Sequence, residues 1–441
     1  MPAPLRFIES SPALPAQADV VVIGGGIIGT FTAYYLAQRG LKVALVEKGV
    51  VAGEQSSRNW GWCRQQNRDS RELPLATMAL DLWEKFGIDS GERTGFRRCG
   101  LFYVSNNDQD LETWATWGKY ARSVGVETRM LNSDEATQQG GFTNQRWKGG
   151  VHSKNDGIAN PGLAAPAVAK AFMALGGTLH QGCAARGIET TGGAVSGVIT
   201  EKGTIRTSIA IQAGGAWASS FCRQLGINFP QATVRQSILA VASGALTLPD
   251  AFFGQSLAIT RRGDGCHSLA ISGRAKVDPT LQFLRYSREF IPMFMRRWGS
   301  LSPGGMQALR AGHETMSHWK MDAQTPMEAM RILDPKPDAK TIRLTRIRAA
   351  KLIPELATVP MVASWAGFVD TTPDGVPVIG ETPSIPGFIL AAGFSGHGFG
   401  IGPGAGHLIA DIASGHKPIV DPRPYRLERF MPGHKIEVAD F

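Results

Sequence analysis

The chain has 441 residues, of which 43% are hydrophobic and 19% are charged, and its formal net charge is +9 at pH 7. This composition is that of a globular protein with a large core, and it excludes a disordered or fibrous chain. No uninterrupted apolar run approaches the roughly 18 residues that a membrane-spanning helix needs.

The first 17 residues predict an irregular lead-in on the surface, because they contain four prolines and no apolar segment typical of a signal peptide. We therefore expect a cytoplasmic protein. Its cysteines are odd in number and form no C-x-x-C pair, which favours free thiols over disulfides or a zinc site. They are Cys63, Cys99, Cys183, Cys222 and Cys266.

Residues 18–49 predict a strand, a glycine turn, a helix and a second strand that together bind a dinucleotide. Gly24, Gly26 and Gly29 follow the buried run 20–23 with the G-x-G-x-x-G spacing. The first glycine permits a tight turn, the second lets a pyrophosphate approach the backbone, and the third lets helix and strand pack closely. Glu47 ends the second strand, where a carboxylate accepts hydrogen bonds from ribose hydroxyls and disfavours the 2′-phosphate of NADP.

Elements of the same kind recur further along the chain, so the cofactor-binding part is not one continuous half. We expect an Ala-rich helix within 156–174, strands near 182–188 and 195–200, and a strand leading into 213–218. The segment 229–356 is richer in aromatic residues, Met and Arg, with a helix over 281–298. Residues 392–415 predict a strand, a glycine turn and a helix that begins near 402–406.

The positive charge invites a nucleic-acid interpretation, which the sequence does not favour. The densest basic run, 340–351, alternates with apolar residues like an amphipathic strand or helix, and it lacks aromatic residues for base stacking. We expect no nucleic-acid partner but a field that attracts anionic substrates. We also expect no metal, because His313, Glu314 and His318 form H-E-x-x-x-H, one residue too long for two ligands on one helical face.

Six segments, in this order, resemble the D-amino-acid oxidase and sarcosine oxidase superfamily of FAD-dependent oxidoreductases that act on amines and amino acids. The resemblance extends over residues 19–430. The segments are VVVIGGGIIG with Glu47, SSRNWGWCRQ (56–65), DGIANP (156–161), AGGAWA (213–218), TPDGVPVIG (372–380) and GFSGHGFGIGPGAG (393–406).

The resemblance implies an α/β fold, with a Rossmann-like FAD-binding domain and a discontinuous α+β substrate domain built on an antiparallel sheet. We assign 18–92, 150–228 and 361–431 to the first domain, and 93–149 and 229–360 to the second. FAD is the implied cofactor. We expect it to be non-covalent, because residues 367–374 contain no cysteine where sarcosine oxidases attach their flavin.

The resemblance also assigns residues to FAD, including a glycine-rich helix start that would direct N–H groups at the flavin N1 and O2 atoms. The predicted FAD-binding residues are Gly24, Gly26, Gly29, Glu47, Lys48, Ser56, Arg58, Asn59, Gly61, Ala184, Gly214, Trp217, Gly396, Gly398, Gly400 and Gly402.

At the substrate, the resemblance places Arg64 on the carboxylate, where a planar guanidinium suits two parallel hydrogen bonds. We predict that Arg64 and His397 are catalytic and that Trp62, Arg261 and His267 line the substrate pocket. A structural ion pair for Arg64 and a structural hydrogen bond for His397 are the alternatives. Gly400 stands where sarcosine oxidases carry a second carboxylate-binding lysine, which disfavours sarcosine as substrate.

The implied reaction is oxidative deamination, favouring a broad-specificity L-amino-acid oxidase. A hydride leaves the α-carbon for flavin N5, and water converts the imino acid to a 2-oxo acid and ammonia, with O2 or another compound as electron acceptor. Two alternatives stay open. One is a dehydrogenase of D-amino acids, secondary amines or 2-hydroxy acids that reduces a quinone or dye, and the other is a non-catalytic flavoprotein subunit. A homodimer is compatible with each of them.

Overall fold

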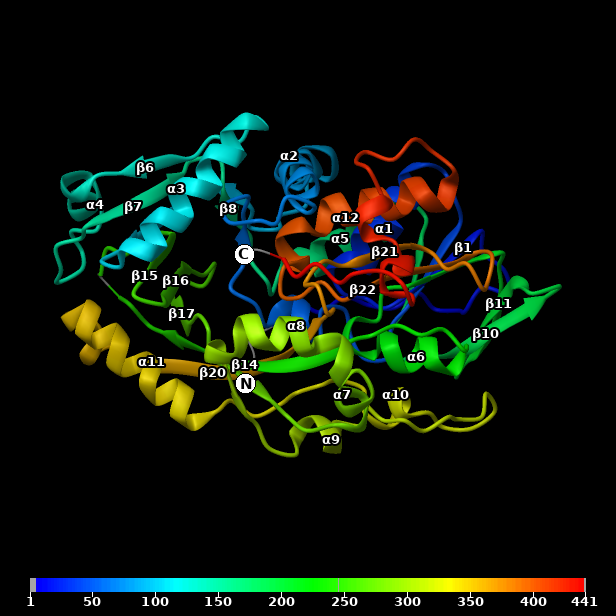
Figure 1. Ribbon diagram of the computed structural model, residues 1–441. Helices are drawn as coiled ribbons and strands as arrows, with labels where there is room; N and C mark the ends of the chain where they lie inside the picture. Colours follow the sequence, from blue (N-terminus) through cyan, green and yellow to red (C-terminus); the bar gives the residue numbers. More distant parts are fainter. Residues whose placement is uncertain (1–4, 245, 440–441) are drawn as a thin grey trace.

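The computed structural model describes residues 5–244 and 246–439, and two large sheets organise them. In Figure 1, helices α1, α2, α5 and α12 gather around the six-stranded sheet on the right, while α3, α4 and α11 lie with the ten-stranded sheet on the left. The predicted α/β fold class is confirmed. The helices are α1 (Ile27–Gln38), α2 (Leu73–Ser90), α3 (Asp108–Ser123), α4 (Ser133–Gln139), α5 (Ala164–Ala174), α6 (Ala218–Gln224), α7 (Leu281–Arg285), α8 (Ser287–Arg297), α9 (Gln307–Ala311), α10 (Pro326–Ala329), α11 (Ala339–Leu352) and α12 (Gly398–Ser414).

The six-stranded sheet has the order β21-β22-β13-β1-β2-β9, and all of its neighbouring strands are parallel except β21 and β22. Both faces of its central strands are buried, which explains their uninterrupted apolar sequences. Its strands are β1 (Val20–Ile23), β2 (Val43–Val46), β9 (Thr178–His180), β13 (Ile209–Gln212), β21 (Val378–Glu381) and β22 (Phe388–Ala392).

The ten-stranded sheet has the order β19-β18-β14-β17-β16-β15-β5-β7-β6, and β20 pairs with β14 in an antiparallel register from Ala232↔Thr371 to Val241↔Met361. Its strands are β5 (Leu101–Ser105), β6 (Arg129–Leu131), β7 (Gly149–Ser153), β14 (Ala232–Val241), β15 (Ala251–Gly254), β16 (Leu257–Arg261), β17 (His267–Ile271), β18 (Ala275–Val277), β19 (Leu301–Pro303) and β20 (Met361–Thr371). Two of these strands, β7 and β20, come mostly from segments that we assigned to the cofactor domain. The domain boundaries stay a prediction.

Two small sheets complete the fold. The first, β10-β11-β12, projects to the right in Figure 1, and the second, β3-β8-β4, pairs the segment that follows β2 with residues on either side of the substrate region. Their strands are β10 (Ala185–Thr191), β11 (Ala194–Thr200), β12 (Gly203–Arg206), β3 (Trp62–Cys63), β4 (Arg97–Arg98) and β8 (Gly157–Ile158).

Three predicted segments are helical, with different bounds. The basic run is α11, whose first turn is capped by the Asp338 side chain. The helix expected over 281–298 is present as α7 and α8, separated at Tyr286. Helix α12 begins at Gly398, so the predicted start near 402–406 is wrong.

Helix α1 is buried over almost its whole length, between the parallel sheet and α12. A Cβ at Gly406 in α12 would lie 2.6 Å from the Phe31 Cβ, and one at Gly402 would lie 2.9 Å from Ile27. These glycines therefore let two helices approach closely, and this packing requirement explains why the glycine run continues far past the start of α12.

Within the described part of the chain, no helix is both long and apolar enough to cross a membrane. All five cysteines are free.

Replacing Gly29 by Val tests the contact on which the first strand and helix depend. A Cβ at Gly29 would lie 1.9 Å from the Gly24 carbonyl oxygen. We therefore expect the free energy of unfolding to fall by about 1–3 kcal/mol or more. The measurement is the free energy of unfolding in denaturant. The matched control is Gly87→Ala in α2, where the new Cβ meets nothing within 4 Å and stability stays the same or rises slightly. Equal stability of Gly29→Val and the parent would contradict the packing argument.

Candidate cofactor and substrate site

A cavity of about 740 Å³ lies between the two large sheets. Its lining includes the ends of β1, β2 and β13 on one side and residues of β5, β14, β15 and β20 on the other. Its size is within the range of pockets that hold small molecules and cofactors. The carboxyl ends of parallel strands open toward it, where ligands bind in folds of this type.

At one end of the cavity, the β1–α1 turn has the geometry that its glycines require. Gly24 has a φ of +110°, and a Cβ there would lie 2.5 Å from the Ala213 carbonyl oxygen. The Ile27 N–H at the start of α1 donates to Ser56 Oγ over 2.9 Å. The other N–H groups of this first turn have no partner within the helix, so with the helix dipole they suit a phosphate.

Glu47 lies beside this turn and is held by backbone groups at both oxygens. Its Oε2 accepts from the Gly25 N–H and its Oε1 from the Gly49 N–H, each over 2.7 Å. Burial raises the pKa of this carboxyl, while Lys48 and the two N–H groups lower it. The lone pairs that remain on the two oxygens suit ribose hydroxyls, the role predicted for Glu47.

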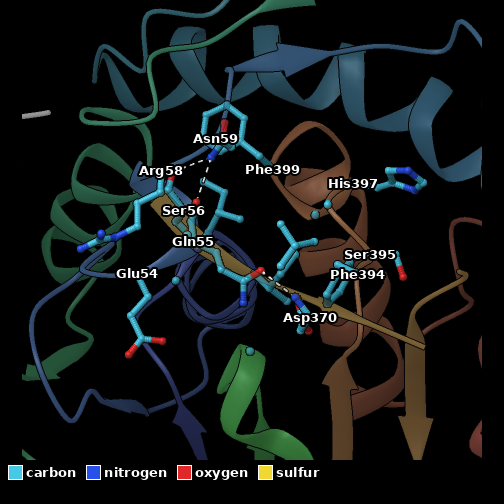
Figure 2. Close-up of a pocket in the computed structure, with 18 of the residues that line it drawn as sticks. Glu54, Gln55, Ser56, Arg58, Asn59, Asp370, Phe394, Ser395, His397 and Phe399 are labelled. Atoms are coloured by element: carbon cyan, nitrogen blue, oxygen red, sulfur yellow. Dashed lines mark hydrogen bonds between the residues drawn. The ribbon is translucent and has the colours of Figure 1, made fainter. Parts of the chain in front are cut away.

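Two predicted cofactor residues, Lys48 and Arg58, line the cavity but direct their charges at protein groups. Lys48 Nζ lies 2.5 Å from Glu54 Oε1, and it also donates to the carbonyls of residues 330 and 331. Arg58 pairs with Asp334 over 2.6 Å and donates to the carbonyls of residues 53 and 366. Figure 2 shows the Arg58 side chain extending away from Asn59 and His397. Both cations therefore hold the 54–59 loop in place.

The loop also stabilises itself. The Asn59 side chain donates to the Ser56 and Gln55 carbonyls and accepts from the Gly61 N–H, as part of this network in Figure 2 shows. Gly61 has a φ of +85°, and a Cβ there would lie 2.4 Å from the Ala159 carbonyl oxygen. The SSRNWG segment is thus a turn held by its own hydrogen bonds, and it borders the cavity.

Aromatic side chains form the other end of the cavity. Trp62 stacks on Tyr103 with ring centroids 5.9 Å apart and contacts Trp60 edge-on at 5.2 Å. Tyr103 in turn contacts Phe253 and Trp114. All five line the cavity, so this end suits a large apolar or aromatic group. Trp217, also predicted, lies at the opposite end beneath the Lys48 ammonium.

Arg64 lies at this aromatic end, as a half-buried part of the cavity lining. Its Nη1 donates to the Gln66 carbonyl. The segment is fixed by Asp156, whose carboxylate accepts from the Gln65 and Gln66 N–H groups over 2.7 and 3.1 Å. Burial raises the pKa of Asp156 to about 6, against the lowering effect of these bonds. The predicted role of Arg64 on a substrate carboxylate remains a prediction.

His397 borders the cavity and precedes α12, and its ring is paired with an interior carboxylate. Nδ1 lies 2.9 Å from Glu72 Oε2, and Glu72 is completely buried. In Figure 2 the imidazole points away from Gln55 and Asp370. Burial lowers the pKa of His397, while Glu72 raises it. The structural hydrogen bond that we considered as the alternative is therefore present.

The structure brings most predicted residues to the cavity but leaves some outside its lining. Gly29 contacts Gly24 behind the turn, Gly400 packs on the Trp62 carbonyl, and Gly402 packs on α1. Ala184 bonds to Glu201 through its N–H, and its neighbour Ala185 lines the cavity instead. The glycines were assigned by their spacing, which does not distinguish contact with a ligand from contact between elements.

Arg261 and His267 lie on neighbouring strands at a distance from the cavity lining, so the structure does not place them in the substrate pocket. Arg261 is exposed near Asp250, and the His267 Nδ1 is 2.5 Å from Ser243 Oγ. Burial lowers the pKa of His267 to about 4. The TRRGDGCHS segment is a hairpin whose register the sequence alone did not reveal.

Sequence reasoning missed several lining residues, among them Gln236 and Ile238 on β14. They alternate with Arg235, which faces the other way and pairs with Asp278. Because successive side chains of a strand point to opposite faces, the alternation along β14 indicates which residues face the cavity. The sequence did not predict this strand, so the alternation could not be used. Asp370 was also missed. It lies at the end of β20, where its carboxylate accepts from the Gly393 N–H over 2.7 Å.

No group of three His, Cys, Asp or Glu residues in the described ranges has an arrangement that could hold a metal.

Taken together, the parallel sheet, the glycine turn, Glu47 and the cavity that continues to a second sheet define a dinucleotide-binding protein with space for a further ligand. The family model described as "FAD dependent oxidoreductase" matches residues 19–412, and the chain belongs to this family. It is an FAD-dependent enzyme that acts on amino acids or secondary amines, which confirms the predicted class and cofactor.

Among curated proteins, the chain is 29% identical over 416 residues to glycine oxidase from Pseudomonas aeruginosa, covering 92% of this chain and 97% of that one. It is 24% identical to sarcosine oxidase subunit beta from an Arthrobacter species, covering 99% and 97%. Among solved structures, L-amino acid deaminase from Proteus myxofaciens in complex with anthranilate superposes with a TM-score of 0.92 at 27% identity, covering 98% of each chain. The Proteus vulgaris enzyme gives 0.91 at 29%, covering 96% of this chain and all of that one.

The residues present fit FAD. Gly24 and Gly26 line the cavity without side chains, and Glu47 and the start of α1 supply the acceptor and donors for ribose and phosphate. Gly396, Gly398 and Gly214 border the region between these groups and the aromatic end.

Acid precipitation tests the non-covalent attachment. Within the described residues, the cavity lining contains no cysteine, and we expect the denatured protein to release all of its FAD into the supernatant. The measurement is the visible absorbance of supernatant and pellet. Colour that stays with the washed pellet would show a covalent bond and overturn this prediction.

Proposed function

We propose that the enzyme deaminates L-amino acids with large apolar or aromatic side chains. The carrying observation is the position of Arg64 beside the aromatic cluster of Trp60, Trp62, Tyr103, Trp114 and Phe253, all on one cavity. A cation next to an apolar surface fits an amino acid, whose carboxylate is anionic and whose side chain needs burial. The likeness to two L-amino acid deaminases over nearly the full chain supports this choice.

In this proposal, the chain's own residues mainly position the substrate. Arg64 binds the carboxylate, and the aromatic cluster buries the side chain and excludes water, so that the α-carbon is held in one orientation. The bound FAD supplies the oxidant, since it accepts a hydride from the α-carbon. The imino acid is then released into solvent, where water hydrolyses it to a 2-oxo acid and ammonia.

No acid–base pair of side chains is required for this reaction. His397 is bonded to Glu72, and Asp370 is bonded to the Gly393 N–H and to Gln231. An amino acid whose ammonium loses its proton before oxidation needs only a solvent path, and the half-buried Arg64 marks the side of the cavity closer to solvent.

An anaerobic panel of substrates tests the function directly. We expect L-amino acids with large apolar side chains to bleach the visible absorbance of the flavin faster than glycine, sarcosine or 2-hydroxy acids. The same panel of D-enantiomers serves as the stereochemical control. A preference for D-amino acids, secondary amines or hydroxy acids would replace the proposal by one of those alternatives, and no bleaching by any compound would favour a non-catalytic subunit.

Truncating Arg64 tests its role. If the guanidinium holds the substrate carboxylate in a partly desolvated site, Arg64→Ala lowers kcat/KM. The lost transition-state stabilisation is roughly 2–5 kcal/mol, the range for removing one partner of a buried charge pair. This corresponds to a loss of about 30-fold to several thousand-fold. Arg64→Lys recovers only part of the loss, because an ammonium does not make the two-pronged contact. FAD content is measured alongside, and a variant with full flavin and full activity would show that the carboxylate binds elsewhere.

A further inference from the structure

Arg68 is a buried arginine whose guanidinium has almost no partners. Its side chain lines the same cavity as Arg64, and the residue is only 3% exposed. Within the described ranges, its guanidinium makes one long hydrogen bond, from Nε to the Arg64 carbonyl at 3.4 Å, and Nη1 is buried without a partner. A guanidinium offers five N–H donors, so this one is far from satisfied.

Two other deeply buried arginines each have an acidic partner, although the Nε of Arg235 is also buried without a hydrogen bond, whereas no described carboxylate forms an ion pair with Arg68. Arg58, at 5% exposure, pairs with Asp334 and donates to two carbonyls. Arg235, also at 5%, lies 3.4 Å from Asp278 and donates to a carbonyl over 3.0 Å. Because an unpaired buried charge is costly, a cation left without an acceptor beside a cavity indicates an anionic ligand.

The backbone holds Arg68 in this place. Its carbonyl accepts from the buried Trp117 indole over 2.8 Å, and the preceding Asn67 has a φ of +58°. Asp156 fixes the residues just before them through two N–H groups. The backbone at Arg68 is therefore fixed, and its buried side chain lies at the cavity wall.

Two carboxylates act on Arg68 without forming a hydrogen bond to it. Asp156 accepts from two backbone N–H groups. Glu72 uses Oε2 for His397, while its Oε1 is buried without a hydrogen-bond partner. Arg64 adds a second positive charge four residues earlier, and burial together with Arg64 lowers the pKa of Arg68 to about 10, so it stays charged at neutral pH. The aromatic end of the cavity thus presents two cations, and within the described ranges no carboxylate is hydrogen-bonded to the inner one.

We propose that Arg68 is a second, inner binding residue for the substrate carboxylate, which it shares with Arg64. This inference rests on the proposed function and narrows it. A carboxylate between two guanidiniums is required for tight binding, so the site selects free amino acids and discriminates against their amides and esters and against simple amines.

The test is a titration of the FAD-loaded protein with benzoate, an aromatic acid that does not react, followed by the shift in the visible flavin spectrum. Benzamide is the neutral probe of the same shape. We expect Arg68→Gln to weaken benzoate binding by about tenfold to a thousandfold, with little change for benzamide. Arg68→Lys retains part of the affinity. The control Arg98→Gln removes one charge at a surface site paired with Asp81 and Glu84, and it leaves benzoate binding unchanged.

Glu72→Gln separates the proposal from a structural ion pair. If Arg68 serves the ligand, removing the Glu72 charge keeps or strengthens benzoate binding. If Arg68 instead exists to neutralise Glu72, Arg68→Gln binds benzoate as the parent does while losing thermal stability, and this result overturns the proposal. If Arg68→Gln does not fold, Arg68→Lys replaces it in the titration. The lysine keeps the charge but changes the donor geometry, so an unchanged benzoate affinity in this variant also counts against the proposal.

The experiments distinguish failure of the Arg68 proposal from failure of the proposed deaminase function. Substrates that do not bleach the flavin of the parent enzyme, together with benzoate binding that depends on Arg68, would retain the anion site and reject the deaminase function. Bleaching by L-amino acids in the parent, with benzoate binding independent of Arg68, would do the reverse.

Discussion

The close contact between the Gly24 carbonyl and Gly29 is the constraint on which the rest of the structure depends. It brings α1 against β1, and α1 then lies buried between the parallel sheet and α12. Because α12 can approach α1 only through its own glycines, the position of α12 follows from the same requirement. The start of α12, and with it His397, is thereby placed at the cavity.

Local signals in the sequence were sufficient for the cofactor side of the fold. The glycine turn, Glu47 and the 56–61 segment each show a short pattern of residue types in one continuous stretch, so the sequence predicts them, although Gly24 and Gly61 also pack against the distant Ala213 and Ala159. The structure places Gly400 and Gly402 outside the cavity lining, and a glycine required for close packing has the same sequence appearance as one required by a ligand. The start of α12 was misplaced for this reason.

The substrate side depends on pairings between distant strands, which the sequence did not reveal. On β14, the Arg235 side chain faces away from the cavity and pairs with Asp278, while Gln236 and Ile238 on the same strand line the cavity. Arg261 and His267 are drawn together by a hairpin register, away from the cavity. In each case the residue type was suitable, and only the alternation of the strand decided which face it occupies.

The loop between Glu54 and Asn59 is anchored by protein partners alone. Lys48 and Glu54, Arg58 and Asp334, and the Asn59 side chain with its own backbone hold it at the cavity. A wall that is ordered before its ligand arrives loses little conformational entropy when the ligand binds. The contacts of this loop with the rest of the chain therefore lower the entropic cost of binding the cofactor at this wall of the cavity.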